Sequence, residues 1–173
     1  TVHSHLVGLV DSFLRAVMSD VNNFCMLSED EAAENSKHIR YLKYIWDVNV
    51  FEKKLKIKWQ VFQHNLLRKA ANPIVIREIN SNANTKRLNY HDYTDSGARF
   101  IAIGGYSLSR GLTLEGLCVS YFYRNSKMYD TLLQMGRWFG YKDGYGDIFK
   151  IWMTEEAVHN YEYITVYQKN ILW

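Results

Sequence analysis

The first part of the chain alternates apolar and polar residues with the period of an α-helix. Between residues 5 and 18, apolar positions three and four apart form one stripe, which predicts a helix that packs against a core. The stripe consists of Leu6, Leu9, Val10, Phe13, Leu14 and Val17. The nearby His3 and His5 have no cysteine or carboxylate at ligand spacing, so they are interpreted as surface or capping residues.

Two more helical patterns follow and are predicted to form a helical insertion over residues 28–72. Ser28 and Glu31 have the spacing of a capping box, which predicts a helix over residues 29–46. A third helix is predicted from residue 51 to a point before Pro73, because a residue that precedes proline is displaced from helical geometry. Its lysines fit a solvated face, or alternatively a surface that contacts a phosphate backbone; they are Lys53, Lys54, Lys56 and Lys58.

From residue 74 onward the pattern changes to short apolar runs bounded by polar turns. Strands are predicted over residues 74–79, 100–103, 117–123 and 147–153, with a helix over 126–139 and another that begins after Thr154. The strands at 100–103 and 117–123 are almost continuously apolar, which is typical of strands covered on both faces. Alternating strands and helices favour an α/β fold with a mainly parallel sheet, in one domain over residues 1–173.

Composition narrows the class of protein. A chain of 173 residues with 47% hydrophobic residues can bury a sizeable core, which excludes a disordered tail. The net charge of +3 is too small to indicate a nucleic-acid binder by itself. The distant Cys25 and Cys118, with no leader or long apolar run, favour a reduced cytoplasmic protein without a membrane span. A start at Thr1 suggests a piece of a longer polypeptide.

Two loops concentrate the residues that could bind a ligand. The first follows the strand at 100–103, where Gly104 and Gly105 allow close approach and Arg110 offers a cation suited to phosphate. A hairpin turn would use the same glycines. The second holds Gln134 and Arg137, which share one face of the predicted helix end. An arginine there could reach a transferring phosphoryl group, although a lone arginine usually forms a surface ion pair.

The residues of these loops resemble known motifs. The segment from Ser109 to Thr113 resembles the fifth motif of superfamily-two helicases, and Gln134 to Arg137 resembles the sixth. Residues 104–117, 121–126 and 133–141 resemble the Z-one domain family, which carries an endonuclease label, and the likeness extends over about 74–165. This resemblance implies a three-layer RecA-like domain, the second motor domain of a prokaryotic or phage protein of restriction or defence systems.

The resemblance also implies roles for individual residues. Arg137 matches the finger arginine, and Gln134 matches the glutamine that organises the nucleotide cleft. Arg110, Gly111 and Thr113 match the loop that couples nucleotide to nucleic acid. Gly105 is expected to contact the nucleotide and Ser109 the nucleic acid, with Ser81 in the fourth-motif loop. Thr113 replaces the common aspartate, for which Glu115 could substitute, and Lys142 stands where a second arginine is expected.

Missing motifs limit what this chain can do alone. It has no phosphate-binding loop with a following acidic box, so ATP and Mg²⁺ are expected to be held mainly by an amino-terminal RecA-like domain of the same protein. The expected function is half of a DNA-dependent ATPase or translocase, with no resident metal. Two alternatives stay open: a metal-dependent nuclease using Asp92, Asp95 and Glu115, or a nucleotide-independent DNA-binding module.

Overall fold

The computed structural model describes residues 2–79, 93, 97–105, 116–122, 146 and 148–171. It divides into two compact units, Thr1–Gly105 and Tyr106–Trp173. The first unit contains α1 (Val2–Phe24), α2 (Glu29–Asn35), α3 (Lys37–Val48), α4 (Phe51–Leu55), α5 (Trp59–Asn65), α6 (Leu67–Ala71), β1 (Val75–Ile79) and β2 (Phe100–Gly104). The second contains β3 (Val119–Phe122), β4 (Lys150–Met153) and α9 (Glu155–Ile171).

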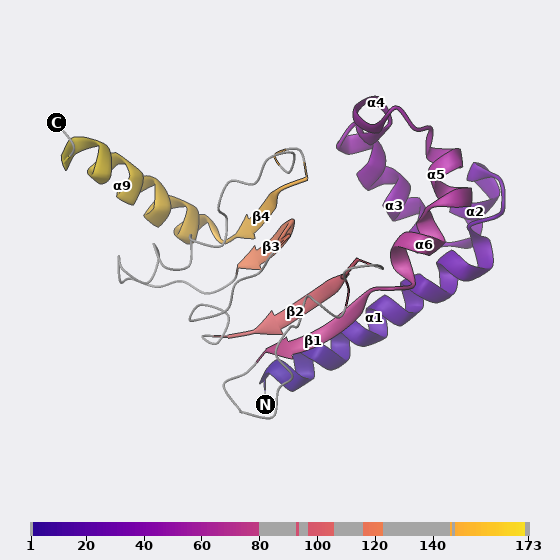
Figure 1. Ribbon diagram of the computed structural model, residues 1–173, viewed down its shortest axis with the longest axis horizontal. Helices are drawn as coiled ribbons and strands as arrows, with labels where there is room; N and C mark the ends of the chain where they lie inside the picture. The colour runs from indigo at the N-terminus through magenta and orange to yellow at the C-terminus, as the bar shows by residue number, and fades with distance from the viewer. Residues whose placement is uncertain are drawn as a thin grey trace. The chain divides into compact units, whose positions relative to one another are not determined.

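The main hydrophobic core of the first unit lies among its helices. Helices α2 to α6 gather beside the carboxyl-terminal half of α1 (Figure 1). The buried cluster consists of Val21, Cys25, Ala32, Ile39, Trp46, Trp59, Leu67 and Ala71. Trp46 contacts the rings of Phe51, Trp59 and Phe62, with centroid distances of 5.7, 5.6 and 4.6 Å. Aromatic packing of this kind stabilises a core beyond the area that it buries.

The buried residues of α1 are not those of the predicted apolar stripe. Val21 is fully buried, whereas Leu6, Leu9 and Phe13 are 45%, 57% and 60% exposed. The prediction that all the apolar residues of this stripe cover a core was therefore wrong for these three. A stripe read from spacing is wider than the face that packing covers, because periodicity does not reveal which neighbour lies on which side.

The predicted helices of residues 28–72 are present but more divided than expected. The capping box is confirmed, since the Ser28 hydroxyl accepts from the Glu31 amide and the Glu31 carboxylate accepts from the Ser28 amide. The predicted helix over 29–46 is two helices, because Ser36 ends α2 and caps α3. The next helix is divided at Lys56, in left-handed geometry, and at Leu66. It ends at Ala71, before Pro73, as predicted.

The strands of the first unit form a parallel pair beside α1. Val75 pairs with Phe100 and Ile79 with Gly104, so the carboxyl ends of β1 and β2 lie together. Helix α1 contacts both strands, and its amino terminus lies at the end to which their arrows point (Figure 1). The Arg77 guanidinium lies 5.6 Å from the Phe100 ring centroid, a cation–π contact across the pair.

The second unit contains another parallel pair and one long helix. Val119 pairs with Lys150 and Phe122 with Met153. The predicted cap of α9 is confirmed, because the Thr154 hydroxyl accepts from the Ala157 amide at 3.2 Å. Ala157 and Ile164 on α9 are buried. The helix predicted over residues 126–139 lies outside the described residues.

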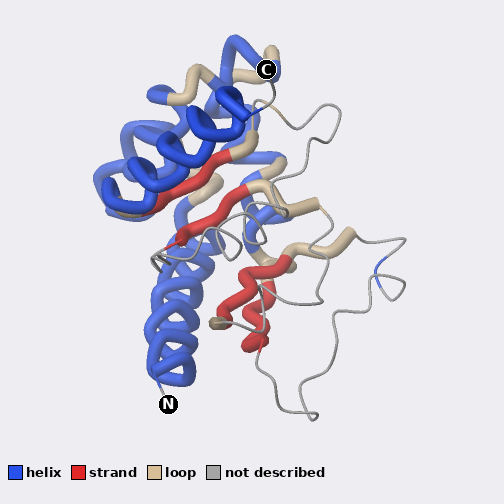
Figure 2. The backbone as a smooth tube through the Cα atoms, turned by 90° about the vertical axis from the view of Figure 1, so that its left-hand side faces the viewer, coloured by secondary structure: helices blue, strands red, loops and turns tan. Residues whose placement is uncertain are grey.

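The prediction of a three-layer RecA-like α/β domain with a mainly parallel sheet was wrong. The described chain is mostly helical, and its strands form two separate two-stranded sheets (Figure 2). The predicted cover on both faces was also wrong for β3, since Val119 and Tyr121 are 58% and 77% exposed. An apolar run predicts a strand but does not determine which layers pack on it, so the layer count could not be read from the sequence.

Candidate functional site

The carboxyl ends of β1 and β2 form the candidate site, because ligands of parallel sheets bind where the strands end and the loops begin. Ile79 and Gly104 are register partners at this edge, and Gly105 follows directly. Gly105 was predicted to face a nucleotide. Residues 106–115, which continue the predicted nucleotide-facing loop after Gly105, lie outside the described residues.

His3, which the sequence analysis interpreted as a surface or capping residue, lies against this glycine. A Cβ atom added at Gly105 would lie 3.0 Å from both Cε1 and Nε2 of His3. His3 lies in the first turn of the long helix α1, and the contact of α1 with both strands brings its imidazole to the edge of the sheet. Glycine therefore leaves room for an imidazole, whose two nitrogens can donate or accept a hydrogen bond. Nothing local in the sequence signals this contact, because it joins residues far apart in the chain.

Most of the predicted site residues lie outside the described residues. The expected roles of these residues stay predictions: Ser81, Ser109, Arg110, Gly111, Thr113, Glu115, Gln134, Arg137 and Lys142, with Asp92 and Asp95 for the nuclease alternative. Within the ranges that the structure describes, no group of three or more His, Cys, Asp or Glu side chains is arranged to hold a metal ion. In the same ranges, every helix is too short or too polar to cross a bilayer.

A second polar cluster, formed by Asp20, Ser36 and His38, has the residue types of a hydrolase triad. Asp20 Oδ2 accepts from the Ser36 hydroxyl at 2.6 Å and lies 2.7 Å from His38 Nδ1. The hydroxyl is therefore bonded to the carboxylate rather than to the imidazole, and Ser36 is only 1% exposed. A nucleophilic serine needs a base on its hydroxyl and access to substrate, so this cluster is structural.

The partners of Asp20 in this cluster nevertheless stabilise its charged form. The hydrogen bond from Ser36 lowers the pKa of the Asp20 carboxyl, with a further lowering from His38 and from the charge of Lys37, while burial opposes the shift. Ser36 also accepts from the Ile39 amide at 3.0 Å and so caps α3. One carboxylate thus fixes the junction of α2 and α3 against α1.

Comparison with known proteins identifies a family by its domain model. No curated protein and no solved structure matches this chain. The family model of the Z1 (Z-one) domain matches residues 1–172, which is almost the entire sequence and includes the helical first third. The chain therefore belongs to the Z1 domain family.

Proposed function

We propose that this chain is one part of a DNA-dependent ATPase or translocase. ATP and Mg²⁺ would be held mainly by an amino-terminal domain of the same protein, and this chain would supply Arg137 to the transferring phosphoryl group. The observation that supports the proposal most directly is the edge of the β1–β2 pair, where both strands end together and the absence of a side chain at Gly105 lets the His3 imidazole lie against the backbone.

The motif resemblance supplies the chemistry of the proposal. Arg137 and Gln134 stand in a sequence that resembles the sixth helicase motif, and Arg110 and Gly111 in one that resembles the fifth. A forked guanidinium suits the developing charge on phosphoryl oxygens better than an ammonium does. A metal-dependent nuclease, or a module that binds DNA without nucleotide, is a competing outcome of the same experiment.

The test is the ATPase activity of the longer protein with Arg137→Ala. Loss of a finger arginine lowers turnover by about 10³-fold or more, while ATP binding is largely kept because the partner domain holds the phosphates. Turnover would be measured with and without DNA, and ATP affinity by equilibrium titration. The matched control is Arg99→Ala, because Arg99 is exposed and precedes β2.

Three results would contradict the proposal. Unchanged turnover in Arg137→Ala would remove the finger assignment, and DNA affinity that ignores ATP analogues would favour a plain binding module. Metal-dependent cleavage of plasmid DNA that survives in Arg137→Ala would favour a nuclease.

A further inference from the structure

One face of α3 combines basic and aromatic side chains. Its residues Lys37, Arg40, Tyr41 and Tyr44 are spaced i, i+3, i+4 and i+7, so they lie on the same side of the helix. These four residues form the basic–aromatic face. All four are exposed, whereas the buried residues of α3 lie on the opposite side and belong to the hydrophobic core. The core therefore does not account for the composition of this face.

The exposed aromatic rings of the first unit gather around this face. The rings of Tyr41 and Tyr44 stack, with centroids 6.1 Å apart and 25° between their planes. The Phe13 ring of α1 contacts His38, one helical turn before Tyr41, with centroids 5.5 Å apart. Phe13, Tyr41 and Tyr44 are each 60% exposed, and among the described residues of the first unit they are the exposed aromatic side chains. Exposed rings beside cations provide a surface on which flat groups can stack.

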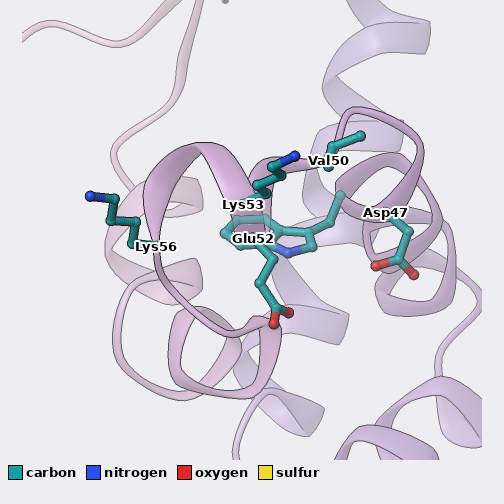
Figure 3. Close-up of a pocket in the computed structure, with 6 residues that line it drawn as sticks. Asp47, Val50, Glu52, Lys53 and Lys56 are labelled. Carbon is teal, nitrogen blue, oxygen red and sulfur yellow. The ribbon is translucent and has the colours of Figure 1, made fainter.

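The two cations of the basic–aromatic face are not neutralised by α3 itself. Among the residues that the structure describes, Lys37 and Arg40 form no ion pair. The one carboxylate of α3 is Asp47, which lines a cavity between α3 and α4 (Figure 3) and is paired with the Lys43 ammonium at 2.6 Å. Lys43 also lies 3.3 Å from Glu29 of α2. The positive charge that remains on α3 is therefore that of the face.

The neighbouring helices do not supply a paired carboxylate either. The charge of Lys37 contributes to the lowered pKa of Asp20, but that carboxylate is bonded to Ser36 and lies against His38. The acids of α2 that have no ion pair or capping bond are Asp30 and Glu34, and both are exposed. Neither pairs with a cation of the face, so the face favours an anionic partner.

We propose that the basic–aromatic face of α3 binds single-stranded nucleic acid. Unpaired bases stack on the exposed rings of Tyr41 and Tyr44, and phosphates bind Lys37 and Arg40, each of which lies one turn before a tyrosine. Stacking needs bases that are not paired, so a duplex satisfies the cations alone. The site goes beyond the proposed motor function and does not require it, since no residue of the face lies on β1 or β2 or in the helicase-like segments.

The direct test is the fluorescence anisotropy of a labelled oligothymidylate during titration with the 173-residue chain, without ATP. Tyr41→Leu and Tyr44→Leu should each weaken binding about tenfold, because each removes one stacking ring. Tyr41→Phe and Tyr44→Phe keep the ring and should keep the affinity. Tyr163→Leu is the matched control, because Tyr163 is 62% exposed on the distant helix α9. Leucine variants that bind like wild type, or equal weakening in Tyr163→Leu, would contradict stacking on α3.

The salt dependence of binding tests the cations. Lys37→Gln and Arg40→Gln should each reduce the slope of log affinity against log salt concentration by about 0.7, as expected for loss of one phosphate contact on a single strand. Lys69→Gln is the matched control, because Lys69 is exposed on α6 and should leave the slope unchanged. All three side chains are exposed, so folding should survive, and circular dichroism checks it. An unchanged slope in both α3 variants overturns the phosphate assignment.

Competitors distinguish single-stranded nucleic acid from other anionic partners. Unlabelled oligothymidylate and oligouridylate should both displace the probe, and the stronger of the two identifies DNA or RNA as the preferred strand. Duplex DNA and polyglutamate should displace it more weakly, because neither offers unpaired bases. Polyglutamate that competes as well as oligothymidylate would indicate an acidic protein partner and overturn the proposal. The ATPase test with Arg137→Ala is separate, since this binding is measured without ATP, so failure of either proposal can be recognised by itself.

Discussion

At the scale of single residues, Asp20 shows how one carboxylate can hold a junction. Its Oδ2 atom accepts from Ser36 and lies within hydrogen-bond distance of His38, whose ring packs edge-on against Phe13 with centroids 5.5 Å apart. The sequence does not indicate this cluster, because Asp20 lies on α1, far in sequence from Ser36 and His38 at the start of α3. Only the capping serine belongs to a pattern that local sequence can indicate.

This carboxylate predicts a specific pH dependence of stability. The pKa of Asp20 in the folded state is lowered from its ordinary value of 3.8, chiefly by the Ser36 hydrogen bond and then by His38. A lowered pKa contributes stability that is fully present above the unfolded value and is lost as pH falls through the folded one. The difference in unfolding free energy between wild type and Asp20→Asn should therefore shrink as pH falls below about 4.

The measurement is urea unfolding of both proteins from neutral to acidic pH, followed by circular dichroism. Subtracting the two curves removes the contributions of the other carboxyl groups. A difference that stays constant through the acidic range would show that the Ser36 and His38 bonds do not stabilise the charged form of Asp20.

At the scale of elements, Gln63 joins two segments of the helical core. It is fully buried, accepts from Trp59 Nε1, and donates to the carbonyls of Cys25 and Leu27 at 3.2 and 2.9 Å. Helix α5 is thereby fixed to the turn between α1 and α2. A buried glutamine whose amide donates twice and accepts once is a structural connector, and its burial could not be predicted from an amphipathic pattern.

We expect Gln63→Leu to lower the free energy of unfolding by about 2–4 kcal/mol, because it removes the partner of the buried Trp59 indole N–H and of the Cys25 carbonyl, while the Leu27 carbonyl keeps its contact with His64 Nε2. The matched control is Gln60→Leu on the exposed face of the same helix, where the loss should stay within about 0.5 kcal/mol. Chemical denaturation of the two variants beside wild type provides the comparison. Equal losses in both variants would contradict the assignment of Gln63 as a connector.

The type of each helix or strand was predicted better than its boundaries and interruptions. The strands at β1 and β2, the Ser28 cap and the end of the helices before Pro73 could be predicted, because each depends on residues close together in the sequence. The interruptions at Ser36 and Lys56 could not. Ser36 ends a helix because its hydroxyl is occupied by both Asp20 and the Ile39 amide, and the first of these partners is distant in sequence.

At the scale of the whole molecule, the buried cluster of the helices lies entirely between Val21 and Ala71. The first unit, Thr1–Gly105, therefore contains its own core and needs no side chain of the second unit to complete that cluster. The prediction of one mainly parallel sheet was wrong at this scale, because a sequence pattern identifies strands but does not reveal how many strands join one sheet. At the strand edge, the contact of His3 with Gly105 could not be predicted from the sequence, and the role expected of Gly105 stays a prediction.

A fragment that ends at Gly105 should accordingly unfold cooperatively and retain helical circular dichroism. A sharper criterion is the effect of Gln63→Leu, which should be the same within about 0.5 kcal/mol in the fragment and in the full chain if the core is self-contained. A fragment that unfolds without a transition, or a much smaller effect of the substitution, would show that the second unit is needed for the core.

The parallel pairing of both strand pairs has a consequence for the order in which the chain folds. β1 ends at Ile79 and β2 begins at Phe100, while β3 ends at Phe122 and β4 begins at Lys150. Parallel strands cannot be joined by a tight turn, so each pair requires closure of a long loop, whereas the helices meet through short connections. The helices should condense early and the strands pair late. During synthesis, the unpaired strand edges are then the surfaces that remain open longest to another copy of the chain, and aggregation should start there.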